Sequence, residues 1–434
     1  MNGLTKIFVL RAFSVKLRPW QNNLNKTLLW VWYNSVNFSL LFSMLFASYG
    51  LAATEPVRLY LDADATNTIE STLSIEQGIL TALHEVNNEL AGRPVELVKL
   101  DHQGNSARSR QHLEQYLQDE NALALFSGLH SPPLLANLTF INQQKILALV
   151  PWAAAGPITR YAGGENWVFR LSIDDSKAGY VITDYAVKQR KFKTPHLLLE
   201  RTGWGKANHK VMTTALLALG YAEPRVTWFN WGVVEGKARA ILRTISYSNA
   251  DVIFFVGNAP EGKTFAKAML KLPETQHLPI ASHWGITGGD FPKVIDVTMR
   301  EQLDLAFIQT CFSFLDIDDD PFAQNVLKQA KTLFPQLKTA YDIKAPTGFI
   351  HAYDLTRILI AAVNQIELTQ NIVQDRAAVH LALEDLQQPV EGLLKTYNKP
   401  FSVFSKDNTD AHEALNMQDF TMGHYGQQGE IDLY

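Results

Sequence analysis

Short apolar runs alternate along most of this chain with longer segments in which apolar residues recur at helical spacing. Val57 to Leu61 is a short run, and Val95 to Leu100 is the next one. Between them, one apolar face of a predicted helix is formed by Ile75, Ile79, Leu83, Val86 and Leu90. Repeated strand–helix–strand units of this kind predict parallel sheets with helices on both faces.

The alternation continues to about residue 310, and then the pattern becomes mainly helical. Further strands are predicted at 122–126, 146–150, 167–170, 196–199, 226–229, 252–256, 280–281 and 305–308. Helices are predicted at about 132–143, 175–189 and 347–368, and the last forty residues are polar. Blocks 56–171 and 172–310 each have the size of one domain, so we expect an α/β fold of two doubly wound parallel-sheet lobes. Ligands of such sheets bind beyond the carboxyl ends of the strands.

Residues 1–53 have the composition of an export signal. They contain five basic residues and no acidic one, and the first acidic residue is Glu55. The uncharged stretch from Thr27 to Ala53 ends in small residues, which is typical of a secretory signal cleaved near Ala52. The same stretch is long enough to span a bilayer if it is retained. We expect a signal peptide or an N-terminal anchor, and a periplasmic location for the rest of the chain.

Charge and cysteine content exclude several classes of partner. Without residues 1–53 the chain has 34 basic and 43 acidic residues, a net charge of −9, which argues against nucleic acid and anionic membranes as partners. Cys311 is the only cysteine, so neither an intrachain disulfide nor a cysteine-based metal cluster can form. We expect no cofactor and no metal.

Gly257 to Thr264 matches the phosphate-loop pattern, between an apolar strand and a helix. Glu261 would place a carboxylate among the N–H groups that bind phosphate. No Asp at a strand end clearly supplies a second magnesium ligand. A nucleotide triphosphatase is therefore the weaker alternative to a binding function.

Four aspartates precede a predicted helix that begins near Pro321. They are Asp316, Asp318, Asp319 and Asp320. Their spacing lacks the central Gly and closing Glu of a calcium loop. Asp before a proline in the first helical turn is typical of a helix cap, so we expect a capping role.

Several residues that follow predicted strands have side chains suited to ligand binding. Ser131, at a helix start, suits a ligand carboxylate, although simple helix capping is the alternative. Trp152, Trp204 and Trp284 follow three strands, and Asn258 follows another. The tryptophans suit an aromatic or apolar pocket, with packing between lobes as the alternative.

The order of several segments resembles the type I periplasmic binding proteins, in the branched-chain amino acid and amide branch that serves ABC transporters. The resemblance covers residues 56 to about 410. Its segments are Gly78 to Asn88 (GILTALHEVNN), Gly92 to Leu97 with Asp101, Phe126 to Gly128 with Ser131, Ile146 to Pro151, Asn166 to Arg170, and Tyr353-Asp354.

The resemblance implies two lobes that close on a ligand about a three-segment hinge. It places the three crossovers near Leu171, Thr310 and Leu394. Lobe 1 would then comprise residues 54–171 and 311–393, and lobe 2 residues 172–310 and 394–434.

The resemblance also implies individual ligand-binding positions. Ser131 takes the position of a hydroxyl that binds a ligand carboxylate, and Ala153 that of a helping backbone group. Trp204 and Asn258 replace aromatic residues of the cleft, and Ala154 or Ala155 stands where a ligand-binding Thr is usual.

A second departure concerns charge. His283 and Trp284 stand where the family has an acidic residue that pairs with the ligand's amino group. Losing that charge-assisted bond removes about 1.5–3 kcal/mol. We therefore expect an aromatic, amide-bearing or uncharged ligand more than a standard branched-chain amino acid.

The function that these observations favour is a solute-binding component of an ABC importer, which is not an enzyme. The small-molecule ligand would be an amino acid, amide or aromatic compound. An accessory that senses a ligand for a membrane receptor or kinase would use the same lobes, so it stays open as an alternative.

Overall fold

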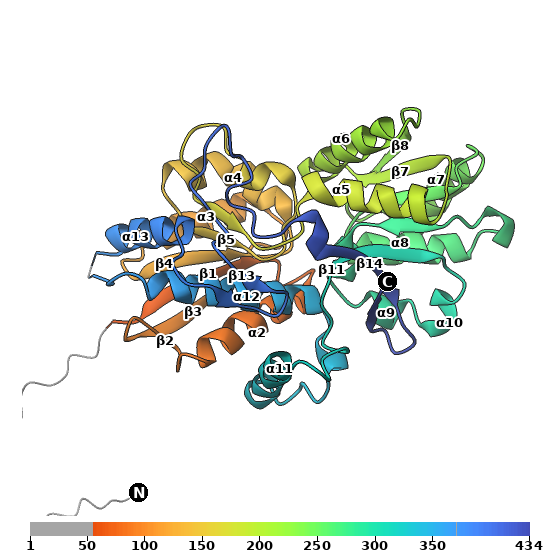
Figure 1. Ribbon diagram of the computed structural model, residues 1–434. Helices are drawn as coiled ribbons and strands as arrows, with labels where there is room; N and C mark the ends of the chain where they lie inside the picture. Colours follow the sequence, from red (N-terminus) through yellow and green to blue (C-terminus); the bar gives the residue numbers. More distant parts are fainter. Residues whose placement is uncertain (1–54, 370) are drawn as a thin grey trace, which may run out of the picture. The chain divides into compact units, whose positions relative to one another are not determined.

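The computed structural model describes residues 55–369 and 371–434, and residues 55–434 form one compact unit (Figure 1). The predicted signal or anchor at 1–53 lies outside the described residues. Within the described ranges, no helix is long and apolar enough to cross a membrane.

The first sheet has six strands in the order β2-β3-β1-β4-β5-β6. The strands are β1 (Val57–Ala63), β2 (Glu89–Leu90), β3 (Arg93–Asp101), β4 (Ala122–Ser127), β5 (Ala148–Val150) and β6 (Val168–Arg170). The helices in these segments are α2 (Ile69–His84), α3 (Ser106–Gln118) and α4 (Ser131–Gln143). Strands β1 and β3–β6 pair in parallel, and every residue of β4, β5 and β6 is buried, as expected for strands covered on both faces.

The second sheet has seven strands in the order β15-β14-β11-β10-β9-β7-β8. Its parallel strands are β7 (Pro195–Glu200), β8 (Arg225–Phe229), β9 (Val252–Val256), β10 (Ile280–Ser282) and β11 (Leu305–Thr310). Helices α5 (Asp175–Asp184), α6 (Gly203–Ala218), α7 (Glu235–Ser246), α8 (Ala259–Leu270), α9 (Phe291–Val294) and α10 (Val297–Arg300) lie between residues 171 and 304. Strands β14 (Phe420–Tyr425) and β15 (Ile431–Leu433) complete the sheet in antiparallel orientation.

The predicted α/β fold of two doubly wound lobes is confirmed, and the predicted strands agree with the observed ones to within about two residues at each end. The antiparallel strands β2, β14 and β15 were not predicted. Each contains polar or exposed residues, so none has the continuous apolar run that marks a buried parallel strand.

The chain passes between the two sheets three times. It leaves the first sheet after β6, and leaves the second after β11 to form α11 (Pro321–Leu333), α12 (Pro346–Val363) and α13 (Ile372–Glu384). A two-stranded ribbon, β12 (Val390–Glu391) and β13 (Thr396–Tyr397), then precedes the return to the second sheet at β14. Phe401 and His412 still contact Phe169 of β6. We therefore place the third crossover after Glu413, about twenty residues beyond Leu394.

Helices α2 and α12 lie side by side in Figure 1, and Gly78 explains how closely they approach. A Cβ atom at Gly78 would lie 2.3 Å from the carbonyl oxygen of Phe349 and 2.9 Å from the amide nitrogen of Tyr353. Only glycine allows this approach of two backbones. The contact fixes the start of α12, and with it Thr347, relative to the first sheet.

Candidate ligand-binding site

One small cavity brings together loops that follow strands of both sheets. From the first sheet, the loops after β4 and β5 contribute Leu129, His130, Ser131, Pro132, Trp152 and Ala154. From the second sheet, the segments after β7, β9 and β10 contribute Glu200, Trp204, Asn258, Trp284 and Gly285. We call this space the tryptophan cleft. It lies at the carboxyl ends of the strands, where doubly wound sheets bind ligands.

Five of the seven residues predicted to bind ligand line the tryptophan cleft: Ser131, Ala154, Trp204, Asn258 and Trp284. Trp152, which the loop positions also singled out, lies with its ring centre 5.8 Å from that of Trp284. All three tryptophans are at most 5% exposed. Aromatic side chains from the two lobes, Trp152 and Trp284, therefore contact each other at the cleft.

Ala153 and His283 do not line the tryptophan cleft. The Ala153 carbonyl accepts a hydrogen bond of 3.3 Å from Arg170. His283 is fully buried, with its Nε2 2.8 Å from Oδ1 of Asp175, and the Trp204 indole nitrogen donates to the same oxygen at 3.1 Å. His283 thus lies behind Trp204 and orients it through Asp175.

Glu200 is a cleft residue that the sequence analysis missed. It is the last residue of β7, it is fully buried, and no described Lys, Arg or His forms an ion pair with it. Its oxygens accept hydrogen bonds from the Thr202 hydroxyl at 2.6 Å, the Trp231 indole at 3.0 Å and the Asn258 amide at 3.4 Å. Its position at the carboxyl end of a strand, directly before Thr202, is the signal that would have found it.

Burial raises the pKa of Glu200 to about 7, although the hydrogen bonds from Thr202 and Trp231 act in the opposite direction. The carboxylate charge of Glu261 contributes further to the raised pKa. The cleft therefore holds a carboxyl group whose charge is only partly compensated by neutral donors. A cation brought by a ligand would stabilise its ionised form.

Two hydrogen-bond donors face the same space. The Trp152 indole nitrogen is buried and has no hydrogen-bond partner among the described residues. The Ser131 hydroxyl accepts from the Ala155 amide at 3.2 Å, which leaves its own hydrogen to donate. Pro132 and Pro133 lack N–H groups, so the start of α4 offers fewer backbone donors than the sequence analysis expected for a carboxylate.

The two lobes are in contact around the cleft. The Trp231 ring, from the loop after β8, lies 5.1 Å from the ring of His130 in the first lobe, whose Nε2 is 3.1 Å from Asp64. The remaining cavity is about 10 Å³, which is room for about one water molecule. A ligand must therefore enter while the lobes are apart, and closure would bring Trp231 of the second lobe against His130 of the first.

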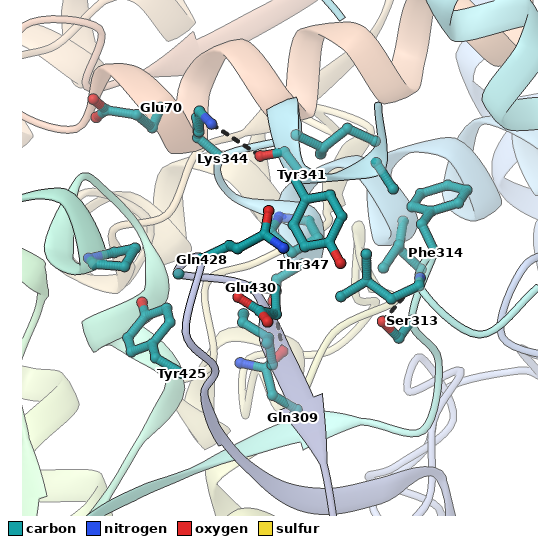
Figure 2. Close-up of a pocket in the computed structure, with 18 of the residues that line it drawn as sticks. Glu70, Gln309, Ser313, Phe314, Tyr341, Lys344, Thr347, Tyr425, Gln428 and Glu430 are labelled. Atoms are coloured by element: carbon teal, nitrogen blue, oxygen red, sulfur yellow. Dashed lines mark hydrogen bonds between the residues drawn. The ribbon is translucent and has the colours of Figure 1, made fainter. Parts of the chain in front are cut away.

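A larger cavity of about 420 Å³ is lined in part by Gln309 and Phe312, on either side of the predicted crossover at Thr310, and we call it the hinge-side cavity (Figure 2). Figure 2 shows Tyr341 and Thr347 from one stretch of chain and Gln428 and Glu430 from another around this cavity. The Thr347 hydroxyl donates to Gln309 at 2.9 Å, while Lys344 bonds the Tyr341 carbonyl at 2.9 Å. This hinge-side cavity has the larger volume, but it contains none of the predicted ligand-binding residues, and most of its polar groups are already paired or exposed.

The phosphate-loop motif forms a strand, a turn and a helix, but not a phosphate-binding loop. Helix α8 already begins at Ala259, so Glu261 to Lys263 are helical and cannot form a loop around phosphates. The Glu261 side chain accepts a hydrogen bond from the Gly232 amide at 3.0 Å, and Lys263 pairs with Asp290. The side chains of Glu261 and Lys263 are thus both paired with groups of the second lobe.

The substitution Lys263→Ala is expected to leave the protein folded, with a loss of less than about 1 kcal/mol for a partly exposed ion pair. Neither the variant nor the parent protein is expected to release phosphate from magnesium ATP. A phosphate-release assay and a thermal unfolding curve test this. Hydrolysis that disappears with Lys263 would contradict the binding function.

The aspartate cluster behaves as predicted. Asp320 accepts a hydrogen bond from the Ala323 amide at 2.9 Å and caps α11, which begins at Pro321. The capping role is confirmed.

Comparison with known proteins identifies the family. A family model described as "Periplasmic binding protein" matches residues 65–419. The chain belongs to the periplasmic binding protein family. This match confirms the resemblance to type I periplasmic binding proteins of the branched-chain amino acid branch.

A curated relative and two solved structures illustrate the family. A "Leu/Ile/Val-binding protein homolog 3" from Brucella melitensis is 21% identical over 373 residues, which cover 83% of this chain and 92% of the relative. A type 1 periplasmic binding protein from Bordetella pertussis has a TM-score of 0.72 at 18% identity, covering 88% of this chain and 100% of the other. A solute-binding protein of an ABC transporter from R. palustris, in complex with 4-hydroxybenzoate, has a TM-score of 0.70 at 16% identity, covering 87% and 95%. At these identities the structures show a shared fold, and the relatives are binding proteins by name.

Proposed function

We propose that this chain is a periplasmic solute-binding protein that closes on a small molecule in the tryptophan cleft and delivers it to an ABC importer. The ligand is an amino acid or amide with an apolar or aromatic body. The observation that supports this most directly is Glu200, a buried carboxyl group without a cationic partner among the described residues, in a space lined by three tryptophans.

The chemistry of the cleft defines the ligand class. Glu200 requires a donor or a positive charge, and the nearby Trp152 indole and Ser131 hydroxyl can each donate to an acceptor. An α-amino acid or a primary amide supplies donor and acceptor groups a few ångströms apart. The tryptophan faces favour an apolar or aromatic remainder, and a cationic nitrogen beside them gains cation–π attraction.

This proposal revises the ligand expected from the sequence. His283 and Trp284 supply no carboxylate at the position where the family has one. Glu200 supplies a carboxylate from a different strand, so an amino group is again a suitable ligand feature. The Brucella relative is named for leucine, isoleucine and valine, and the R. palustris protein is described with 4-hydroxybenzoate, so both apolar amino acids and aromatic acids belong in the test.

A thermal unfolding screen of the purified chain tests the proposal. The panel contains leucine, phenylalanine, 4-hydroxybenzoate, an aliphatic amide, a sugar and magnesium ATP. A ligand at 100 times its Kd stabilises the protein by about 2.7 kcal/mol, so a clear shift is expected with an amino acid or amide. A shift with ATP alone, or with none of these classes, would contradict the proposal.

A variant in each cavity locates the bound ligand. Trp204→Ala in the tryptophan cleft is expected to abolish the shift, whereas Tyr341→Ala in the hinge-side cavity is expected to keep it. The reverse result would place the ligand in the hinge-side cavity and would refute the proposed site.

The affinity for an amino ligand is expected to increase with pH from 6 to 8. Glu200 has a pKa of about 7 in the unliganded fold, so lowering the pH below 7 protonates it and removes the charge that attracts the ammonium group. Well below the pKa, the affinity should fall by up to tenfold per pH unit. Isothermal titration calorimetry at several pH values measures this dependence. An affinity that is flat over this range, or that decreases as pH rises, would contradict the role of Glu200.

A further inference from the structure

Two histidines and a glutamate form a buried cluster in the first lobe, outside the tryptophan cleft. His380 and Glu384 lie one helical turn apart on α13, and His412 lies in the segment between β13 and β14. One donor atom from each residue lies within 4.8 Å of the other two. The Glu384 carboxylate lies 3.0 Å from Nε2 of His412 and 3.8 Å from Nδ1 of His380.

In each histidine ring, the nitrogen that is not near Glu384 lies within hydrogen-bond distance of a backbone carbonyl oxygen. Nε2 of His380 lies 2.8 Å from the Asn166 oxygen, and Nδ1 of His412 lies 3.0 Å from the Val168 oxygen. A carbonyl oxygen only accepts, so each of these nitrogens must hold a hydrogen. In the neutral rings, Nδ1 of His380 and Nε2 of His412 are then the unprotonated nitrogens.

This arrangement leaves a lone pair facing a carboxylate. Nε2 of neutral His412 would lie 3.0 Å from Oε1 of Glu384 with no hydrogen between two acceptors. The contact is favourable only if a hydrogen, bound to His412 or to Glu384, or a metal ion lies between the two atoms.

We propose that His380, Glu384 and His412 bind a divalent transition metal ion, with zinc as the preferred ion. Two imidazoles and one carboxylate are a common zinc ligand set that leaves a fourth position for water. The carbonyl bonds of the outer nitrogens are the contacts that orient metal-binding histidines and fix their tautomer. Zn–N and Zn–O bonds of about 2.0–2.2 Å place tetrahedral donor atoms about 3.4 Å apart. The donor atoms lie within 4.8 Å of one another here, so zinc binding requires side-chain shifts that bring the farthest pair together.

The surroundings hold the ligands in place. The Phe169 ring stacks on His412 with 3.9 Å between centres, and the Trp167 ring stacks on His380 at 4.3 Å. Both histidines are at most 2% exposed. Rotation of either ring is therefore restricted, so the ring planes and tautomers are set before an ion binds.

Metal binding would connect two segments that are distant in sequence. His412 directly precedes Glu413, whose carboxylate pairs with Arg170 at the end of β6. An ion at this cluster would therefore fasten the third crossover to α13 and the first sheet. This role does not depend on the ligand of the tryptophan cleft, so the two proposals can fail separately.

Zinc titration of the full chain, stripped of metal with a chelator, tests the site. Calorimetry is expected to give one equivalent of bound zinc, and thermal unfolding is expected to shift upward with zinc. Glu384→Gln and His412→Asn are expected to weaken zinc binding at least a hundredfold. His84→Asn, at an exposed histidine at the end of α2, serves as the matched control and is expected to bind as the parent does.

Cobalt provides a measurement that does not depend on the variants being folded. Adding one equivalent of Co²⁺ to the stripped parent protein is expected to produce visible absorption bands of a four- or five-coordinate site, which zinc then displaces. If the parent binds neither ion, or if Glu384→Gln binds zinc as tightly as the parent, the metal site is refuted. A hydrogen then lies between His412 and Glu384.

Discussion

The substitution Arg170→Met is expected to lower the free energy of unfolding by about 3–5 kcal/mol. Arg170 is fully buried, and its guanidinium lies 2.6 Å and 2.9 Å from the two oxygens of Glu413 and 3.0 Å from Asp174. Methionine fills a similar volume but supplies no charge, so the buried Glu413 carboxylate loses its main partner. Removing one partner of a buried ion pair costs far more than the pair contributes in net terms.

Urea unfolding followed by circular dichroism measures this effect. Arg190→Met is the matched control, because Arg190 pairs with Asp304 at the surface, where both side chains are about one third or more exposed. That variant is expected to lose less than about 1 kcal/mol. The double variant Arg170→Met with Glu413→Gln is expected to recover part of the loss, because no carboxylate is then left without its partner. A loss below 1 kcal/mol for Arg170→Met alone would show that the pair does not stabilise the fold.

Arg170 also has a place in the hinge. It ends β6 at the first crossover, while Glu413 lies where we place the third. The ion pair thus joins two of the three segments between the lobes.

Continuous apolar strands made most of the fold predictable from the sequence. The run Val252–Val256 is buried along its whole length and its observed bounds equal the predicted ones. The antiparallel strands β14 and β15 differ, because they are only partly buried and contain Thr, His and Asp at positions where the pattern of a buried strand is lost. The third crossover is hard to place from the sequence for the same reason, since residues 398–413 form no strand and contact β6 through aromatic rings and the backbone of His412.

The strand ends that form the candidate site could be predicted from the sequence, but the carboxylate of Glu200 in it could not. Ser131, Trp204 and Trp284 line one cavity because each follows a strand, and strand ends meet at one edge of a sheet; their contact with a ligand stays a prediction. The resemblance points to a carboxylate only at the position of His283, where this chain has none. Which of several strand ends supplies a charge depends on side-chain direction, and a single sequence does not contain that information.

The largest effect on ligand binding is expected from Glu200→Gln. Losing the charge-assisted hydrogen bond to an ammonium group costs about 1.5–3 kcal/mol, which weakens binding by about tenfold to a hundredfold. The variant should also lose the increase of affinity between pH 6 and 8. Calorimetric titration with the ligand found in the unfolding screen measures both effects.

The same substitution is expected to change the stability of the unliganded protein in the opposite direction. The folded-state pKa of Glu200, about 7, is above the ordinary value of 4.5, so the fold favours the protonated carboxyl. Its contribution to stability is fully present below pH 4.5 and is lost as the pH rises through 7. Glutamine has no charge to bury, so the difference in unfolding free energy between variant and parent should shift in favour of the variant from pH 5 to pH 8.

Glu261→Gln separates the role of Glu200 from a general effect of buried carboxylates. Glu261 is also buried with a raised pKa, chiefly because of burial, but its side chain bonds the Gly232 amide and does not line the tryptophan cleft. It is expected to change affinity by less than a few fold. If both variants weaken binding equally, the effect comes from the electrostatic field of buried carboxylates in the second lobe and not from contact between Glu200 and the ligand. A second outcome is that only Glu200→Gln weakens binding and that this variant is more stable than the parent at high pH. The Glu200 carboxylate then contributes to ligand binding while its burial lowers the stability of the free protein.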